Sequence, residues 1–542
     1  MFNKLFLNGP IGSITGAAAV IAVSSFISRI LGLFRDRVLA GEFGAGETLD
    51  IYYAAFRIPD FVYNILIFGS LSAAFIPLFA TYLTAPGDRN EAFRFANIIL
   101  SVGFIVVLPV VFLGIVFAPV LSKFFVAPGF SSEAQEITVA MTRIMFLSPI
   151  LLGISGLVGS ILQSFKRFFV YSLAPIFYNI GIIIGALFFT DFMGVSGLAW
   201  GVVFGAFLHL LIQLPSIYSL GFRFRIIPEF KNEKLRIFAR LMWPRTLNLF
   251  IVQLNLVIVT VIASHLQSGS IAIFNFANNI QSFPVGIIGI SFAVAAFPTL
   301  AQHIANGEKE KFIESLSKAM SEILFFVLPF MVLIIALRAQ IVRVLLGTGA
   351  FDWQDTILTF ETLGLFTISL FAQSVTPLLL RAFYAIHNTI IPLIISILSL
   401  ILNAFLSYYL VFYRLLDVQG LALAFSLSSI VGLLLLWIAL RLYVGYLRDW
   451  HVMLSSFKII VSSVAMVPFI QFAKNVVAKF LSTETFLGIF IQGMASAFAG
   501  ILIYVLVSFL LKSEELSVLY GSLKRHLVKM REGVDISAGR EV

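Results

Sequence analysis

Cysteine is absent from this chain of 542 residues. Without thiols the chain can form no disulfide bond and no thiolate metal site, so cysteine usage gives no indication of the cellular compartment. Charged residues are scarce as well, at 12% of the sequence. Soluble globular proteins carry about 25% charged residues, because charge is what covers their surface. The scarcity of charge therefore excludes an ordinary soluble protein.

The sequence also lacks the motifs of nucleotide hydrolysis and of metal catalysis. It contains no Walker phosphate loop, no Rossmann glycine pattern after a strand, and no metal-spaced set of His, Cys and Glu. We therefore predict that the chain is not an enzyme and binds no metal ion as a cofactor. If it transports a substrate, it must use an ion gradient, the membrane potential or consumption of the product.

Apolar runs are what the sequence has in abundance, since 60% of its residues are hydrophobic. Runs of about 18 residues recur along the chain, and each is long enough to cross the hydrocarbon core of a bilayer. Backbone groups in lipid must be satisfied within their own segment, which predicts helices. We predict an all-α membrane protein with about fourteen transmembrane helices. The expected spans are 16–34, 50–83, 95–118, 133–163, 169–190, 195–220, 237–266, 271–304, 312–337, 356–386, 390–413, 418–444, 455–479 and 486–511.

The cations are distributed unevenly between alternate loops. The richer set consists of Lys4, Arg89, Arg94, Lys166, Arg167, the dense stretch 223–245, Lys309, Lys311, Arg441, Arg448, Lys524, Arg525, Lys529 and Arg531. The positive-inside rule places this set, and with it both termini, in the cytoplasm. Topology thus explains the net charge of +9, and we predict no nucleic-acid partner.

A weak internal repeat divides the chain. The pattern Val-x-Gly-Leu-Ala occurs at 195–199 and again at 418–422, and Ala-Ala-Phe occurs at 73–75 and 295–297. Copies separated by an even number of helices run parallel about an axis along the membrane normal. We therefore predict two six-helix lobes followed by two further helices. The predicted divisions are 1–222 (first lobe), 223–245 (cytoplasmic amphipathic linker and start of helix seven), 246–445 (second lobe), 446–511 (helices thirteen and fourteen) and 512–542 (basic cytoplasmic tail).

Charges and amides within the predicted spans are the candidate substrate-binding residues. A charge inside a membrane span is costly and marks a functional site by default. The candidates are Arg29, Arg35, Asp36, Asp50, Arg57, Asp60, Asn64, Asn278 and Asn279. The alternative interpretation is intramembrane pairing that only holds helices together, for instance Arg57 with Asp60. Guanidinium groups bind phosphate through paired hydrogen bonds, so an anionic lipid diphosphate headgroup fits these residues best.

The candidates fall within a recognisable pattern. Residues 28–36 (SRILGLFRD), 43–46 (FGAG), 55–59 (AFRIP) and 69–77 (GSLSAAFIP) resemble the first two helices of the lipid II flippase family. This family belongs to the multidrug/oligosaccharidyl-lipid/polysaccharide exporter superfamily. Further similar stretches lie at 198–201, 213–215, 283–286, 349–351 and 381–385. The resemblance covers most of the first twelve predicted helices.

The resemblance implies a function in cell-wall biogenesis and cell shape. Family members move undecaprenyl-diphosphate-linked peptidoglycan precursor from the inner to the outer leaflet of the bacterial inner membrane by alternating access. The last two helices would form a groove for the lipid tail. Arg29, Arg35, Asp36 and Asp50 match cavity or gate positions, and Arg57 matches a basic position. The implied partners are the precursor and membrane lipids, and the implied state is a monomer near cell-wall synthesis enzymes. The implied drive is the membrane potential or a coupling Na⁺ or H⁺.

The chain departs from the family pattern in two helices. Many members carry paired arginines and then an acidic residue where this chain has Tyr63, Asn64 and Phe68, and often Asp-Arg where it has Asn278 and Asn279. The cavity would be less cationic than usual. This leaves open a flippase for another polyprenol-linked glycan of the O-antigen or teichoic type, or a cation-coupled drug exporter of the same fold. A membrane scaffold without transport gives no reason for Arg29 and Arg57 within spans.

Overall fold

The computed structural model describes residues 14–65, 75–84, 89–518 and 521. Within these ranges every regular element is a helix and no strand occurs. Each helix satisfies its own backbone hydrogen bonds, as the bilayer interior requires. The predicted all-α fold is confirmed for the described part of the chain.

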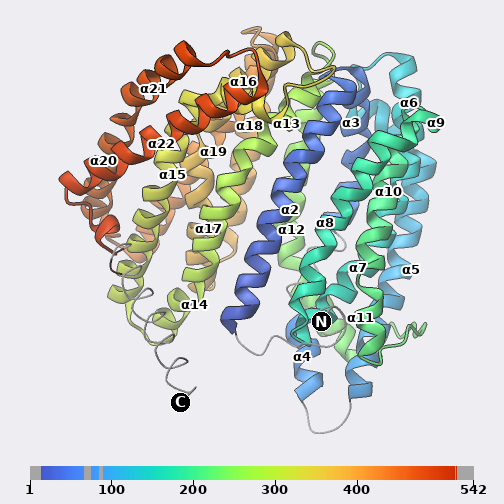
Figure 1. The fold of residues 1–542 in the computed structure, drawn as a ribbon. Helices are drawn as coiled ribbons and strands as arrows, with labels where there is room; N and C mark the ends of the chain where they lie inside the picture. The colour runs from blue at the N-terminus through green and yellow to red at the C-terminus, as the bar shows by residue number, and fades with distance from the viewer. Residues whose placement is uncertain (1–13, 66–74, 85–88, 519–520, 522–542) are drawn as a thin grey trace, which may run out of the picture. The chain divides into compact units, whose positions relative to one another are not determined.

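Figure 1 shows the helices in chain order. They are α2 (Ile14–Phe43), α3 (Glu47–Tyr63), α4 (Ile76–Thr84), α5 (Arg89–Leu121), α6 (Ser132–Met145), α7 (Leu147–Ser164), α8 (Phe168–Ile184), α9 (Thr190–Met193), α10 (Ser196–Leu211), α11 (Leu214–Ser219), α12 (Glu233–Ala263), α13 (Ser270–Pro284), α14 (Ser291–Ala305), α15 (Lys309–Leu345), α16 (Trp353–Thr367), α17 (Leu370–Ala385), α18 (Ile390–Phe412), α19 (Asp417–Val444), α20 (Asp449–Val464), α21 (Met466–Phe480) and α22 (Phe486–Leu510). Three π-helical turns, η3 (Ser122–Val126), η4 (Gly185–Phe189) and η5 (Val285–Ile290), continue α5, α8 and α13.

The expected number of spans is not confirmed. Ten stretches of the described chain are long and apolar enough to cross a membrane, and a bent pair of helices raises this to at most eleven. The remaining three expected spans fall on α2, on α3 with α4, and on α12. Residues 66–74, between α3 and α4, lie outside the described residues, so the span expected at 50–83 is described only in part. In α12 the described apolar stretch is Leu249–Ala263.

Several expected spans consist of two helical segments, and one of them is bent sharply. The span predicted at 356–386 bends by 44° between α16 and α17. At the bend the Ser369 hydroxyl donates to the Phe366 carbonyl and lies 3.0 Å from the Ser426 hydroxyl. Side chains that bond into the helix ladder are a common cause of such bends. The span predicted at 455–479 consists of α20 and α21, which are separated at Ala465.

The chain forms two compact units. The first consists of Met1–Asn279, Leu345–Thr359 and Leu400–Ala424, and the second of Ile280–Val344, Phe360–Ser399 and Phe425–Val542. The lobe boundaries expected from the internal repeat remain a prediction.

In the first unit an aromatic core joins α4 to α5. The Phe75 ring stacks on Phe79 and on Phe95, with centroid distances of 5.2 and 5.6 Å. All three rings are fully or almost fully buried. Aromatic pairs of this kind are worth about 0.5–1.5 kcal/mol each, so this cluster helps to hold α4 against α5.

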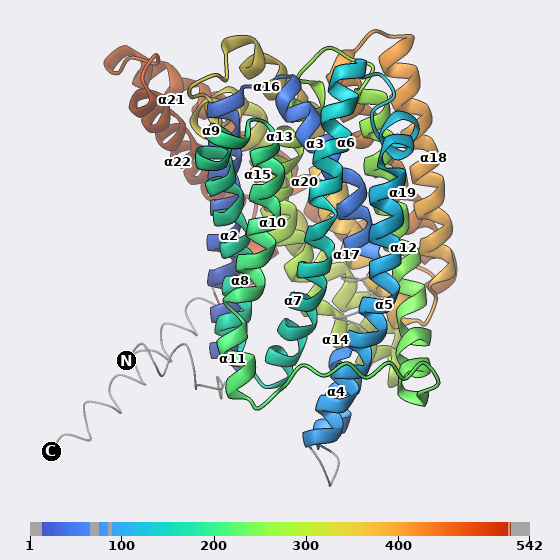
Figure 2. The ribbon, with the colours of Figure 1, turned by 90° about the vertical axis from the view of Figure 1, so that its right-hand side faces the viewer.

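Helices α8 and α10 approach each other through glycine. Figure 2 shows the two side by side. A Cβ atom on Gly181 would lie 2.2 Å from the Cα of Gly205, and one on Gly185 would lie 2.3 Å from the Cα of Gly201. Small residues at such positions let two membrane helices bring their backbones into contact. The pair therefore tolerates no side chain at these four positions.

We expect Gly205→Leu to reduce the amount of folded protein recovered from membranes. The Cβ of the new side chain would lie 2.5 Å from the backbone carbonyl oxygen of Tyr178. Overpacking of this kind costs about 1–3 kcal/mol. Size-exclusion yield after detergent extraction measures the effect. The matched control is Gly103→Ala, because a Cβ there meets nothing within 4 Å; an equal loss in both variants would contradict the interpretation.

The second unit contains a buried polar chain. Gln281 and Gln373 exchange amide hydrogen bonds of 3.1 and 3.0 Å, and Gln373 also donates to Ser369. Further along the unit, Tyr504 on α22 donates to the Phe325 carbonyl of α15 at 2.6 Å. Polar bonds of this type hold membrane helices together where the hydrophobic effect cannot.

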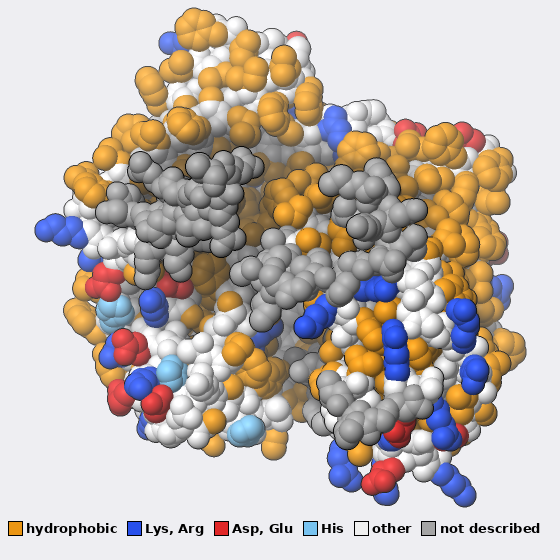
Figure 3. All heavy atoms as spheres, turned by 60° about the horizontal axis from the view of Figure 1, so that its bottom comes forward, with side chains coloured by type: hydrophobic (Ala, Val, Ile, Leu, Met, Phe, Trp, Pro, Cys, Tyr) orange, Lys and Arg blue, Asp and Glu red, His pale blue; other side chains and the backbone are white. Residues whose placement is uncertain are grey.

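Lysine and arginine gather at one end of the helices. Figure 3 views the face at the lower end of Figure 1, where blue side chains stand among white and red ones. Two ion pairs of the first unit, Arg94–Glu229 and Lys234–Glu91, join residues of the loop set that we predict to be cytoplasmic. The orientation of this face in the membrane remains a prediction.

Candidate functional site

On α2, Arg35 and Asp36 form the centre of a polar cluster within the first unit. The Arg35 Nε and Nη2 atoms donate to Asp36 Oδ1 at 3.1 and 2.7 Å, and Nη1 donates to Asn179 Oδ1 on α8 at 3.2 Å. Asn279 on α13 donates to Asp36 Oδ2 at 2.9 Å. Asp36 is only 2% exposed. A buried charge needs partners of this kind, and together they connect α2 to α8 and α13.

Asp50 on α3 caps the beginning of α13. Its Oδ2 accepts a hydrogen bond from the Gly269 backbone N–H at 2.7 Å, and its Oδ1 accepts one from the Ala272 N–H at 2.8 Å. The first N–H groups of a helix have no partner within the helix, and a carboxylate there is favoured by the helix dipole. Asp50 is 4% exposed, so its charge is stabilised almost entirely by α13.

Arg57, two turns further along α3, bonds to neutral partners. Its Nε donates to Thr260 Oγ1 on α12 and its Nη2 to Asn275 Oδ1 on α13, both at 2.8 Å. The alternative interpretation paired Arg57 with Asp60, but these hydrogen bonds go elsewhere. The positive charge of Arg57 is therefore not neutralised by the groups to which it donates.

Asp60 lies one turn beyond Arg57. Gln253 on α12 donates to Asp60 Oδ2 at 3.4 Å, and the Asn64 amide donates to the Asp60 backbone carbonyl at 2.9 Å. The Asn64 side chain thus bonds to its own helix rather than to another one.

The other predicted residues stand apart from this cluster. Arg29 is half-buried on α2 and has no hydrogen-bond or ion-pair partner among the described residues. Asn278 is half-buried beside Asn279 on α13. Phe68 lies outside the described residues. We use the name α2–α3 polar cluster for Arg35, Asp36, Asp50, Arg57 and Asp60 with the side chains that bond to them.

Backbone contacts continue the cluster toward the end of α2. The Ala350 N–H donates to the Gly41 carbonyl at 2.7 Å, and the Ala45 N–H donates to Asp355 Oδ2 at 2.9 Å. Gly269 has a φ of +93°, and a Cβ there would lie 1.9 Å from the Ala45 carbonyl oxygen. Only glycine fits this position without strain.

Many contacts of the cluster join residues of the two predicted lobes. Helices α2, α3 and α8 belong to the predicted first lobe, whereas α12, α13 and residues 345–359 belong to the predicted second lobe. The polar cluster and the Gly41 contact therefore join the two predicted lobes at one end. Most of the contacts are hydrogen bonds to neutral groups, which can be exchanged for other partners at modest net cost.

The chemistry of the cluster is that of binding. It offers guanidinium and amide donors, and the described residues contain no group of three or more His, Cys, Asp or Glu side chains that could hold a metal ion. Guanidinium groups suit phosphate oxygens. The cluster also carries three carboxylates, and binding of an anion by its arginines remains a prediction.

Four partners in the cluster were not predicted: Asn179, Gln253, Thr260 and Asn275. Each is a neutral polar residue with apolar neighbours on both sides in the sequence. A polar residue inside a membrane span is the available signal, since its amide or hydroxyl needs a partner there. This signal is weaker than that of the charges on α2 and α3, because a neutral group costs less to bury than an ion.

Comparison with known proteins gives a consistent result. A family model described as lipid II flippase MurJ matches residues 39–513. A probable lipid II flippase MurJ of Buchnera aphidicola is 32% identical over 422 residues, which is 77% of this chain and 81% of that protein. A solved structure described as lipid II flippase MurJ in an inward closed conformation has a TM-score of 0.73 at 25% identity, covering 93% of this chain and 99% of that one. An inward-facing multidrug resistance MATE family transporter of the MOP superfamily has a TM-score of 0.63 at 16% identity, covering 78% of this chain and 96% of that one.

Proposed function

The chain belongs to the MurJ family of lipid II flippases, and from this premise we propose that it moves undecaprenyl-diphosphate-linked peptidoglycan precursor across the bacterial inner membrane. It is a membrane transporter rather than an enzyme. The precursor is its substrate, and peptidoglycan synthesis is the process it serves.

The observation that carries the proposal is the α2–α3 polar cluster. Its guanidinium groups lie between helices of the two predicted lobes, and Arg57 donates its hydrogen bonds to the neutral acceptors Thr260 and Asn275. A diphosphate can take over these hydrogen bonds. Paired bonds from a guanidinium to phosphate add the attraction of opposite charges, which neutral acceptors lack, so the exchange favours the anionic headgroup.

The polar cluster closes one end of the first unit. We assign this end to the outer face, because the cation-rich loops lie at the opposite ends of these helices and the positive-inside rule places those loops in the cytoplasm. Opening at the outer face then requires Asp50 to release Gly269 and Ala272, and Asp36 to release Asn279. Binding of the headgroup to Arg35 competes with the ion pair between Arg35 and Asp36.

The direction of transport follows from charge. An inside-negative potential is worth about 2.3 kcal/mol per elementary charge per 100 mV, and it drives a net negative headgroup outward. A coupling Na⁺ or H⁺ is the other possible drive. We place the protein in the membrane as a monomer near cell-wall synthesis enzymes, with the lipid tail of the substrate along α20 to α22.

A second candidate function is transport of another polyprenol-linked glycan. Asn64 bonds to its own helix and Asn279 to Asp36, at positions where many members of the family carry charged residues. Fewer cations suit a headgroup with fewer negative charges. Such a substrate shares the diphosphate and differs in the sugar or peptide.

The experiment is complementation. The chain is expressed in bacteria depleted of their own lipid II flippase, and growth and outer-leaflet precursor are measured. We expect rescue of growth together with accumulation of precursor outside. Good membrane expression without rescue, in a strain where a bacterial relative rescues, would contradict lipid II as substrate and favour the second candidate.

A further inference from the structure

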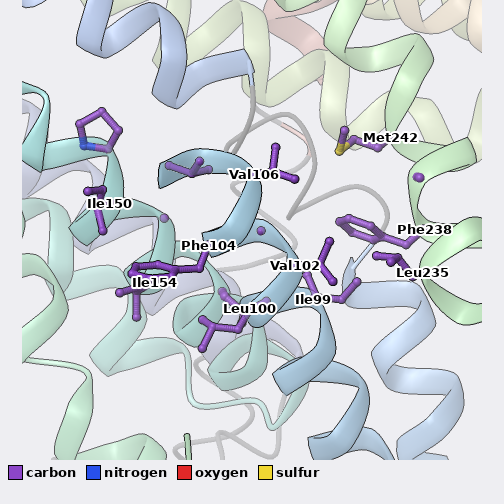
Figure 4. A pocket seen from close by; sticks show the side chains of 16 residues that line it. Ile99, Leu100, Val102, Phe104, Val106, Ile150, Ile154, Leu235, Phe238 and Met242 are labelled. Atoms are coloured by element: carbon purple, nitrogen blue, oxygen red, sulfur yellow. The ribbon is translucent and has the colours of Figure 1, made fainter. Parts of the chain in front are cut away.

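An apolar cavity lies within the first unit, outside the α2–α3 polar cluster. It has a volume of about 310 Å³ and is lined by α5, α7 and α12. Every lining residue is apolar or glycine. Figure 4 shows the lining side chains of α7 to one side of α5 and those of α12 to the other. A cavity without polar groups holds no ordered water and favours a hydrocarbon ligand.

The cavity is accessible from the side of the helices. Phe104 and Val106 on α5 line it and are 42% and 46% exposed. Both lie in a span of high hydropathy, where the surrounding medium is lipid. A hydrocarbon chain can therefore enter directly from the bilayer.

Arginines and a lysine flank the cavity. Leu235, Phe238, Ala239 and Met242 line it at helical spacing along α12. This spacing forms a single stripe. On a helix of 3.6 residues per turn, Arg236 lies beside this stripe and Lys234 lies on its other side, whereas Arg240, one turn beyond Arg236, lies further from the stripe. Arg236 and Arg240 are exposed, and Lys234 is paired with Glu91.

A second basic segment is fixed beside α5. The Arg225 N–H donates to Asn97 Oδ1 at 2.9 Å, and the Ile227 N–H donates to Ser101 Oγ at 2.8 Å. Asn97 and Ser101 are buried on the turns of α5 that also line the cavity. These bonds hold the exposed side chain of Arg225 at the level of the cavity.

We propose that this cavity binds an acyl chain of an anionic phospholipid whose phosphate contacts Arg225, Arg236 and Arg240. An apolar chamber open to the bilayer, with cations at its rim, complements an anionic headgroup and its hydrocarbon chain together. A zwitterionic phospholipid fills the chamber equally well but gains less from the cations. The site is separate from the residues that we assign to the transported substrate.

The test uses the full chain in vesicles of phosphatidylethanolamine with a minor fraction of phosphatidylglycerol that carries a photoactivatable diazirine on one acyl chain. Mass spectrometry of peptides after illumination locates the label. We expect labelling of α5, α7 and α12 around the cavity. Gly103→Phe should lower it about tenfold, because a side chain there meets open space and fills the cavity. Gly103→Ala is the matched control and should leave it unchanged.

The headgroup is tested by Arg236→Gln with Arg240→Gln. Each lost cation should reduce the preference for the anionic probe over a zwitterionic diazirine probe about fivefold. Because both side chains are exposed, these variants should fold even if Gly103→Phe does not. Equal labelling of wild type and Gly103→Phe, equal labelling by both probes, or displacement of the label by a polyprenyl phosphate and not by phosphatidylglycerol would each overturn the proposal. The test measures photolabelling and not transport of the precursor, so its result does not depend on whether the proposed function is correct.

Discussion

We expect Arg29→Ala to abolish rescue of bacteria depleted of their own flippase. Arg29 is a half-buried cation of α2, and it has no hydrogen-bond or ion-pair partner among the described residues. If the diphosphate takes two charge-assisted hydrogen bonds from it, their loss costs about 3 kcal/mol, or roughly 100-fold in binding. The measurement is colony formation after depletion, together with the rate of headgroup exposure in vesicles containing the purified variant.

Two controls separate this effect from instability. Arg143→Ala removes an arginine of α6 whose Nε donates to the Ile115 carbonyl, and we expect full rescue. Arg29→Lys keeps the charge but not the planar fork, so it should rescue partially. Full rescue by Arg29→Ala would exclude Arg29 from substrate binding. Loss of rescue by Arg143→Ala as well would indicate that the assay reports expression.

The second large effect is expected for Asp50, whose carboxylate caps the beginning of α13. Asp50→Ala leaves the Gly269 and Ala272 N–H groups buried without a partner, at about 1–3 kcal/mol each. A loss of about 3 kcal/mol changes the ratio of closed to open molecules more than 100-fold. We therefore expect the beginning of α13 to become accessible. The probe is Ser270→Cys, a near-isosteric change at a fully buried position, labelled with a membrane-impermeant maleimide.

The maleimide can label only the introduced cysteine, because the chain has no cysteine of its own. Asp50→Asn is the conservative variant; it retains one acceptor oxygen and should show an intermediate rate of labelling. Glu47→Ala removes an exposed acidic residue of the same helix and should leave labelling slow. Slow labelling in Asp50→Ala would mean that Asp50 does not hold the closed state.

The sequence predicts the fold class and the residues of α2 and α3, and there are physical reasons for this success. Apolar runs and costly charges are local signals. Arg35, Asp36, Asp50 and Arg57 could be selected because a charge in a span must have a purpose. Their partners depend on which faces of α12 and α13 meet α3. The sequence of one helix does not specify which face of another helix it contacts, so the bonds of Arg57 to Thr260 and Asn275 could not be anticipated.

The apolar cavity could not be predicted for a related reason. A cavity is the space left between side chains of α5, α7 and α12, and no single segment encodes it. The bend between α16 and α17 is equally hidden, because the run 356–386 contains its proline, Pro377, well beyond the bend. Ser369 lies at the bend, and its hydrogen bonds to Phe366 and Ser426 can be seen only in the folded chain.

The glycine contact between α8 and α10 has a mechanical consequence. Side chains between two helices can change rotamer and absorb a small displacement, but backbones in direct contact cannot. Asn179 on α8 accepts a hydrogen bond from Arg35, so we expect a displacement of Arg35 to move α8 and α10 together as one rigid pair.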